Sequence, residues 1–187
     1  MKNSSLRPLF KVSFFLIALV FIASCKNLKP RKPVSNSSSS YNELSIEKNR
    51  QLYAAEEKAI EEVIANLDRK FTRSNNGFYY HFSKMDSTSS PKPKFGDRVT
   101  FAYNVIALNG DTIYHQEELS PVTKSLEQEY GVFKGMREAL KLMHEGDQAT
   151  FYFPSYMGYG YYGDENRIGT NVPFKSDVTL LGINKEQ

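Results

Sequence analysis

Apolar residues between Leu44 and Phe71 recur at the spacing of an α-helix. The members of one face lie at i, i+3, i+4, i+7 and i+11, and are Ile60, Val63, Ile64, Leu67 and Phe71. Glutamate and lysine residues occupy the opposite face, and Asn75-Asn76-Gly77 ends the pattern. This predicts an amphipathic helix whose apolar face packs either on the domain that follows or on a partner protein.

After residue 77 the apolar period shortens from about 3.6 to 2, which is the period of a β-strand. Phe78, Tyr80 and Phe82 form one face of a half-buried strand. Asn109-Gly110 is a strong signal for a tight hairpin between two further strands. Strands are therefore expected at residues 78–83, 99–108, 111–116, 122–126, 149–153 and 178–183.

A single short amphipathic helix interrupts the series of strands. Met136, Ala139, Leu140 and Met143 mark its apolar face, and Gly146 is its expected C-cap. Many strands with one helix among them predict an α+β fold, in which an antiparallel sheet wraps around one short helix. The helix at 44–71 and a flexible tether precede this domain.

About twenty residues between Phe153 and Pro173 follow neither period. They include four glycines together with Tyr156, Tyr159, Tyr161 and Tyr162. A stretch this long without regular structure is uncommon inside a compact domain, and it is usually functional. We expect it to form one wall of a binding site.

The N-terminus has the pattern of an export signal. Lys2, Arg7 and Lys11 precede an apolar run over residues 12–22, which is shorter than the roughly 18–20 residues a spanning helix needs. The run ends at Ile22-Ala23-Ser24-Cys25, which resembles the lipobox of bacterial lipoproteins. This predicts a signal peptide over residues 1–24, lipid on Cys25, a flexible tether over 25–43, a helical spacer over 44–77 and a domain over 78–187.

Removal of residues 1–24 changes the charge of the chain. This segment holds three of the 24 basic residues and none of the 21 acidic ones, so the rest of the chain carries 21 of each sign. Charge therefore gives no support for nucleic-acid binding. Cys25 is the only cysteine, so no disulfide is expected within the chain.

Several kinds of chemistry do not fit the sequence. His81, His115 and His144 are scattered, so neither a metal site nor a cofactor is expected. Residues 158–163 match G-x-G-x-x-G, but no helical pattern follows, as a nucleotide-binding loop requires. A site of aromatic residues and backbone groups, without a nucleophile or metal, favours chemistry that breaks no bond.

The order and spacing of six motifs resemble an FKBP-type peptidyl-prolyl isomerase from about Phe78 to the end of the chain. These motifs are Phe95-Gly96-Asp97, Tyr103 before Gly110, the run 131–136, the run 145–149, Pro154 through Gly158-Tyr159-Gly160, and the run 177–181. With the lipobox and spacer, the chain is most similar to the gliding-motility-associated FKBP-type lipoproteins of Bacteroidetes. The resemblance implies a half-wrapped sheet that grips the short helix beside a shallow apolar pocket.

The resemblance also implies a role for each pocket residue. Tyr103 would line the wall, the Phe133 N–H would hold a substrate carbonyl with Val132 supporting that turn, Tyr159 would donate from its hydroxyl, and Ile168 would close the rim. Four positions depart from the family pattern. Ile113-Tyr114 replaces an aromatic-acid pair, Val122 a phenylalanine, Met136 the tryptophan of the floor, and Ser176 another aromatic residue. Tyr114 is expected to replace the missing acid as a hydroxyl donor.

Two functions remain open from the sequence. The first is a lipid-anchored prolyl isomerase that faces the periplasm and acts on proline-containing exported proteins, with gliding motility as one setting. The second is a binding or assembly module on the same frame, with little or no turnover, in a secretion or motility machine. Lys26 stands where inner-membrane lipoproteins usually carry Asp, which favours the outer membrane.

Overall fold

The structure, a computed structural model, describes residues 38–86, 91–119, 121–126 and 132–184. The predicted signal peptide, Cys25 and most of the predicted tether lie outside these residues. Residues 43–187 form one compact unit, so most of the predicted spacer belongs to the same unit as the sheet. Within the described residues, none of the helices has the length and apolarity needed to span a bilayer.

Helix α2 spans Ser38–Ala65 and differs from the prediction at both ends. Residues 38–43, expected to be flexible, are helical, because a helix extends at low cost once nucleated. The helix ends before Phe71 because the Asn66 side-chain amide donates to the Glu62 carbonyl (2.8 Å) and the next N–H groups bond three residues back. Ile60 is fully buried with Tyr79 and Tyr152, so α2 packs on the sheet.

Eight strands form one antiparallel sheet with the order β1-β2-β7-β8-β3-β6, and β4 pairs with both β5 and β8. The strands are β1 (Thr72–Arg73), β2 (Tyr79–Lys84), β3 (Arg98–Tyr103), β4 (Val105–Ala107), β5 (Thr112–Tyr114), β6 (Val122–Ser125), β7 (Gln148–Phe153) and β8 (Phe174–Asn184). Strand β1 lies before residue 78, where the domain was predicted to start, and yet it pairs with β2 of the sheet.

The alternation predicted for the first long strand is confirmed. Phe78 lies in the main core with Tyr80 and Phe82 packed against it, whereas Tyr79 faces the small cluster under α2. The predicted strand over 99–108 is instead split at Asn104. Its side-chain Oδ1 accepts the Asp177 N–H at 2.7 Å and its carbonyl accepts the Ser176 hydroxyl at 2.6 Å, which breaks the regular ladder.

The hairpin at Asn109-Gly110 is confirmed. Gly110 has φ +97°, a conformation that glycine adopts without strain, and the Ala107 N–H donates to the Asp111 carbonyl at 2.8 Å. The returning strand is shorter than predicted. It ends at Tyr114, and a helical turn that the sequence did not predict, α3 (Gln116–Leu119), follows it.

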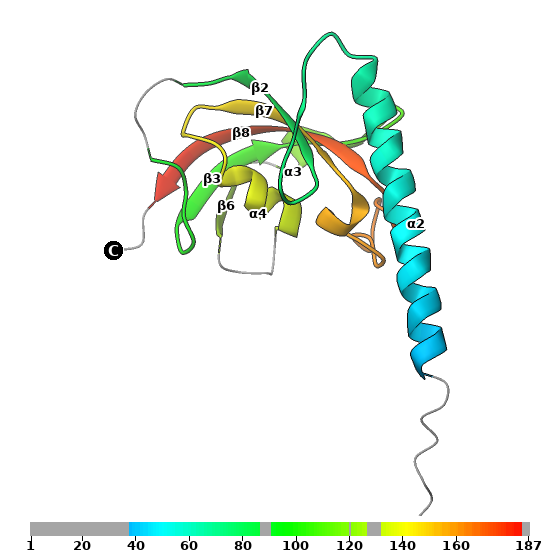
Figure 1. The fold of residues 1–187 in the computed structure, drawn as a ribbon. Coiled ribbons are helices and arrows are strands. Elements are labelled where there is room, and N and C mark those ends of the chain that lie inside the picture. The colour runs from blue at the N-terminus through cyan, green and yellow to red at the C-terminus, as the bar shows by residue number, and fades with distance from the viewer. Residues whose placement is uncertain (1–37, 87–90, 120, 127–131, 185–187) are drawn as a thin grey trace, which may run out of the picture. The chain divides into compact units, whose positions relative to one another are not determined.

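The short helix α4 (Lys134–Leu140) lies against one face of the curved sheet, and α2 packs on side chains of the other face (Figure 1). Met136, Ala139, Leu140 and Met143 are all fully buried, as their spacing predicted. Gly146 is not the C-cap, which is Lys141. Two further turns follow the helix, and Gly146, with φ +89°, donates from its N–H to Leu180.

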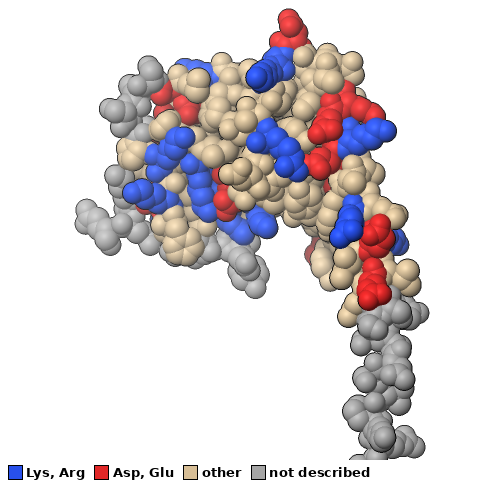
Figure 2. Space-filling model, viewed as in Figure 1, with Lys and Arg blue, Asp and Glu red and all other residues tan. Residues whose placement is uncertain are grey.

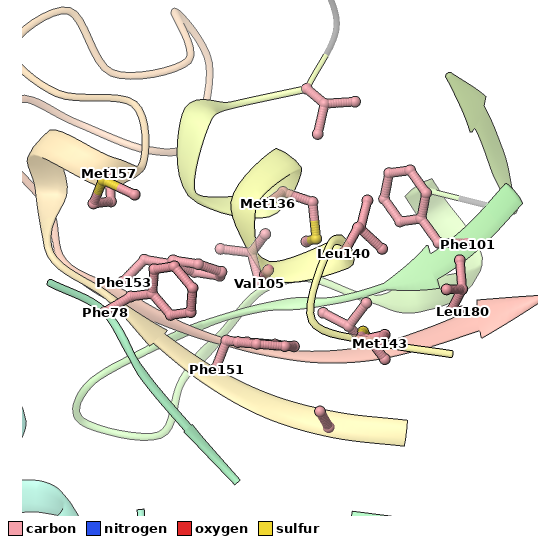
Figure 3. Packing of buried hydrophobic residues seen from close by; sticks show 14 of the residues in the cluster. Phe78, Phe101, Val105, Met136, Leu140, Met143, Phe151, Phe153, Met157 and Leu180 are labelled. Atoms are coloured by element: carbon pink, nitrogen blue, oxygen red, sulfur yellow. The ribbon is translucent and has the colours of Figure 1, made fainter. Parts of the chain in front are cut away.

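The main core fills the space between α4 and the sheet (Figure 3). Its largest fully buried side chains come from β3, β7, β8, α4 and the residue directly before β2. They include Phe78, Phe101, Phe151, Phe153, Phe174, Met136, Leu140 and Leu180. A strongly curved antiparallel sheet that holds the short helix α4 on one face and packs against α2 on the other confirms the predicted α+β fold class.

Candidate active site

Three segments bring tyrosine and phenylalanine side chains together at one edge of the core. Tyr103 ends β3, Phe133 immediately precedes α4, and Tyr159 follows η1, the 3₁₀ turn Ser155–Met157. The Phe133 ring lies 5.1 Å from the Tyr159 ring, and the Tyr103 and Tyr159 side chains lie close enough for each to shift the pKa of the other. The residues for which the resemblance implied a wall, a turn and a hydroxyl donor therefore meet.

The two tyrosine hydroxyls stay protonated at physiological pH. Burial raises the pKa of Tyr103, and burial together with the neighbouring Tyr103 raises that of Tyr159 further. A protonated tyrosine hydroxyl carries one O–H donor. The pair can therefore offer an O–H donor to a carbonyl beside it.

The backbone before α4 offers a second donor. Phe133 has extended backbone angles (φ −63°, ψ 156°), and its carbonyl accepts the N–H groups of Met136 (3.1 Å) and Arg137 (3.3 Å). Its own N–H has no acceptor among the described residues. The Arg137 guanidinium donates to the Val132 carbonyl at 2.9 Å, which fixes the turn from which this N–H projects.

Aromatic residues that the sequence did not single out support Phe133 from below. Phe153 and Phe174 contact its ring at 5.2 and 5.3 Å, in edge-on geometry. Phe174 also lies 5.8 Å from Tyr159. Ser176, where an aromatic residue was expected to be missing, is fully buried and uses its hydroxyl on Asn104. Phe174 and Ser176 are two residues apart and so share one face of β8, and this period-2 spacing could have indicated from the sequence that Phe174 supports the site.

Met136 lies beneath this edge, with no exposed surface. Val132 and Ile168 are also buried, whereas Ile113 and Val122 are half-buried and pack against the same core. All nine predicted pocket residues thus belong to the main core or pack on it. Because Met136 is enclosed, a tryptophan there would require its neighbours to move, so the simple restoration of an indole floor is not available.

Tyr114 does not present a free hydroxyl. Its O–H donates to the Asp164 carboxylate, and the Arg167 guanidinium lies 4.7 Å above its ring. Arg167 also pairs with Glu118 (2.7 Å) and donates to the Ile113 carbonyl (2.9 Å). Sequence reasoning missed Asp164, Arg167 and Glu118. The Asp164 carboxylate, hydrogen-bonded to Tyr114, supplies the acid that the Ile113-Tyr114 pair lacks, and Arg167 pairs with Glu118 beside it.

Asp164 is held in its ionised form. Burial by itself would raise the pKa of Asp164, but hydrogen bonds from Tyr114 and from the N–H groups of Ile168 (2.7 Å) and Asn166 (3.0 Å) lower it below the usual range. The Asp164 N–H in turn donates to the Ile168 carbonyl at 3.1 Å. These bonds tie the irregular loop, including the predicted rim residue Ile168, to β5.

Neither a metal nor a polyanion has an evident place in the described part of the chain. No group of three or more His, Cys, Asp or Glu residues there is arranged to hold a metal ion. On the face shown in Figure 2, the described lysine and arginine residues are interspersed with acidic ones. The site is therefore one of aromatic rings, hydroxyls and backbone donors.

A half-wrapped antiparallel sheet with one helix and a tyrosine-lined edge defines the FKBP-like class of folds. Residues 89–181 match the family model of FKBP-type peptidyl-prolyl cis-trans isomerases. The chain also resembles the probable FKBP-type peptidyl-prolyl cis-trans isomerase FkpA of Neisseria meningitidis, with 33% identity over 110 residues. The chain thus carries an FKBP-type peptidyl-prolyl isomerase domain. This match covers 58% of the chain but only 38% of that relative.

Two solved structures share the fold. A peptidyl-prolyl cis-trans isomerase from Pseudomonas syringae has a TM-score of 0.57 at 22% identity, over 71% of this chain and 96% of its own. FkpA from Escherichia coli has a TM-score of 0.59 at 20% identity, over 99% of this chain and 74% of its own. At these identities the likeness supports the fold alone.

Proposed function

We propose that the protein catalyses cis-trans isomerisation of Xaa-Pro bonds in exported proteins, at the edge formed by Tyr103, Phe133 and Tyr159. The observation that carries this proposal is the convergence of a protonated hydroxyl pair and an open backbone N–H on one aromatic surface. The FKBP-type domain match supports the same chemistry.

The proposed mechanism needs no bond cleavage. The barrier to rotation about an Xaa-Pro bond, about 18–20 kcal/mol, comes from amide resonance, which separates charge in the planar form. An apolar surface of Phe133 and Tyr159 favours the less polar twisted amide. The Tyr159 and Tyr103 hydroxyls and the Phe133 N–H hold the carbonyls on either side of the rotating bond, without reorganising during rotation.

The test is a protease-free isomerisation assay of the full-length chain in detergent, on a set of Xaa-Pro tetrapeptides. Catalysed exchange above the uncatalysed rate on at least one peptide is expected. Equal rates with and without the protein on every peptide would contradict the proposal.

A binding or assembly module with little turnover is the second candidate. Two departures from the family pattern favour it: Met136 is enclosed in the core, and the Tyr114 hydroxyl is committed to Asp164. On this alternative, a Tyr159 variant would change a cellular phenotype in a secretion or motility assay while peptide isomerisation remained at the uncatalysed rate.

We further propose that lipid on Cys25 tethers the domain to the periplasmic side of a membrane, with the outer membrane preferred, and that gliding motility is one setting for its clients. The support is the lipobox and the charge-balanced chain that follows it. Metabolic labelling with a palmitate analogue should mark the wild type. The Cys25→Ala variant should stay unlabelled and uncleaved, and equal labelling of the two would contradict the anchor.

A further inference from the structure

Helix α2 places one carboxylate inside the protein. Glu56 is only 5% exposed and lies one turn before Ile60, on the face of α2 that packs on the domain. Its two oxygens accept the Ser155 N–H (2.8 Å) and the Ser155 hydroxyl (2.7 Å). Among the described residues, no lysine or arginine forms an ion pair with Glu56. Since a buried carboxylate is costly unless hydrogen-bonded, these two bonds are obligatory for the packing of α2.

Ser155, which binds Glu56, is also hydrogen-bonded to the backbone on both sides of Tyr159. It is fully buried and begins the turn η1. Its carbonyl accepts the N–H groups of Gly158 (2.9 Å) and Gly160 (2.8 Å). One residue therefore joins a helix far away in the sequence to the two neighbours of the site tyrosine.

The same turn is held from a second side. The Tyr156 ring lies 4.8 Å from the Tyr53 ring of α2. Its hydroxyl lies so close to Gly77 that a Cβ there would come within 2.1 Å of it. Glu57, the residue after Glu56, pairs with Arg73 of β1 and accepts no hydrogen bond from η1 among the described residues. Among the α2 residues named here, Glu56 and Tyr53 therefore hold η1 directly.

We propose that Glu56 is a positioning residue for the isomerase site, and that through Ser155 it sets the place of the Tyr159 hydroxyl. This inference rests on the proposed isomerase function, because it concerns the same tyrosine. It assigns to α2 a catalytic contribution that a spacer between a membrane anchor and an enzyme would not have.

The chemistry distinguishes Glu56 from a residue that only fills space. In Glu56→Ala, two buried donors of Ser155 lose their acceptors, so η1 has to move to find others. In Glu56→Gln, the amide oxygen can accept the Ser155 N–H while the amide nitrogen donates to the Ser155 hydroxyl. The glutamine variant should therefore restore what the alanine variant loses.

The experiment compares Glu56→Ala, Glu56→Gln and the matched control Glu57→Ala in the full-length chain. One readout is kcat and KM on a prolyl tetrapeptide, and the other is hydrogen exchange of the Gly158 and Gly160 amides. For Glu56→Ala we expect kcat/KM to fall about 10- to 100-fold, mainly through kcat, since misplaced groups cost this much. Exchange at the two glycines should accelerate at least about tenfold, while Phe151 and Leu180 stay protected. Glu56→Gln and Glu57→Ala should stay within about threefold of wild type in both readouts.

Equal kcat/KM for Glu56→Ala and wild type would overturn the positioning role, and so would exchange that rises equally at Phe151 and Leu180. Should Glu56→Ala lack a cooperative melt, Ser155→Ala provides the second test, because it removes only the hydroxyl contact. It should accelerate exchange at Gly158 and Gly160, and unchanged exchange would overturn the proposal. A wild type without isomerase activity would contradict the proposed function, whereas the exchange readout decides separately whether Glu56 holds the loop.

Discussion

The sheet buries very different surfaces on its two faces. Toward α4 it contributes Phe78, Phe101, Phe151, Phe153 and Phe174 to one continuous apolar core. Toward α2 the fully or nearly fully buried apolar residues described are Ile60, Tyr79 and Tyr152. Val63, Ile64, Phe71 and Leu108 pack half-buried against these three, and the Tyr53 ring contacts the Tyr156 ring. Polar pairs make up a large share of the contact, and they are Glu56 with Ser155, Glu57 with Arg73 and Glu61 with Tyr79.

The two faces therefore contribute differently: one mainly to the stability of the fold, and the other to the position of the site residues. Apolar burial scales with area and does not depend on direction, so the α4 face supplies most of the free energy of folding. Hydrogen bonds add little net stability but fix distances, so the α2 face sets where η1 and Tyr159 lie. The site at the edge of the core depends on both faces.

The largest expected effect comes from emptying the α4 face. Leu140→Ala should lower the free energy of unfolding by about 4 kcal/mol, because Leu140 is fully enclosed and its neighbours can close the cavity only in part. Urea denaturation followed by circular dichroism measures this loss. A loss below about 1 kcal/mol would mean that the α4 face is not the main source of stability.

The matched substitution on the α2 face should cost less. Ile60 is as fully buried as Leu140, but its cluster is small and lies near the surface, where neighbours can collapse. Ile60→Ala should therefore lower the free energy of unfolding by about 2 kcal/mol, at the low end for such changes. The same denaturation experiment compares the two variants. A cost equal to or above that of Leu140→Ala would remove the proposed difference between the faces.

The smallest effect concerns one hydrogen bond on the α2 face. Tyr79 donates from its hydroxyl to Glu61 at 2.7 Å, and Tyr79→Phe should cost about 1 kcal/mol. Tyr80→Phe is the control in the same strand, because the Tyr80 hydroxyl has no partner among the described residues, and it should cost less than Tyr79→Phe. Indistinguishable stabilities of the two variants would contradict a role for this bond.

The pH dependence of Tyr79 gives an independent check. Burial, and then the hydrogen bond to Glu61, raises the pKa of Tyr79 to about 12. Since an unfolded tyrosine titrates near pH 10, the native state holds this proton more tightly. The contribution of Tyr79 is complete below about pH 10 and is lost as the pH rises toward about 12. Stability measured across this range should fall less steeply in Tyr79→Phe, and identical slopes would contradict the shift.

Local sequence patterns were sufficient wherever one segment decides its own structure. Asn109-Gly110 predicts its hairpin because the turn needs positive φ, and Phe78 and Tyr79 divide between the two faces by simple alternation. The motifs around Tyr103, Phe133 and Tyr159 placed these residues together because their order along the chain resembles a known domain.

Contacts between distant segments were beyond the sequence patterns. Phe71 matched the helical period but reaches the Tyr152 ring (5.3 Å) from the segment after the helix, so the match extended α2 too far. Asp164, Arg167 and Glu118 meet only because the irregular loop folds back on β5 and α3. The burial of Glu56 could have been predicted, because Glu56 lies four residues before Ile60 and therefore on the apolar face of α2.

The central claim is that the Tyr159 hydroxyl acts on the rotating prolyl bond. The most direct test measures kcat/KM of the full-length chain on prolyl tetrapeptides for wild type, Tyr159→Phe and Tyr161→Phe, where Tyr161 is 70% exposed in the same loop. Loss of one hydrogen bond in the transition state should lower kcat/KM by up to about tenfold in Tyr159→Phe and leave Tyr161→Phe unchanged, with both variants melting like wild type. Equal kcat/KM for all three proteins would contradict the assignment.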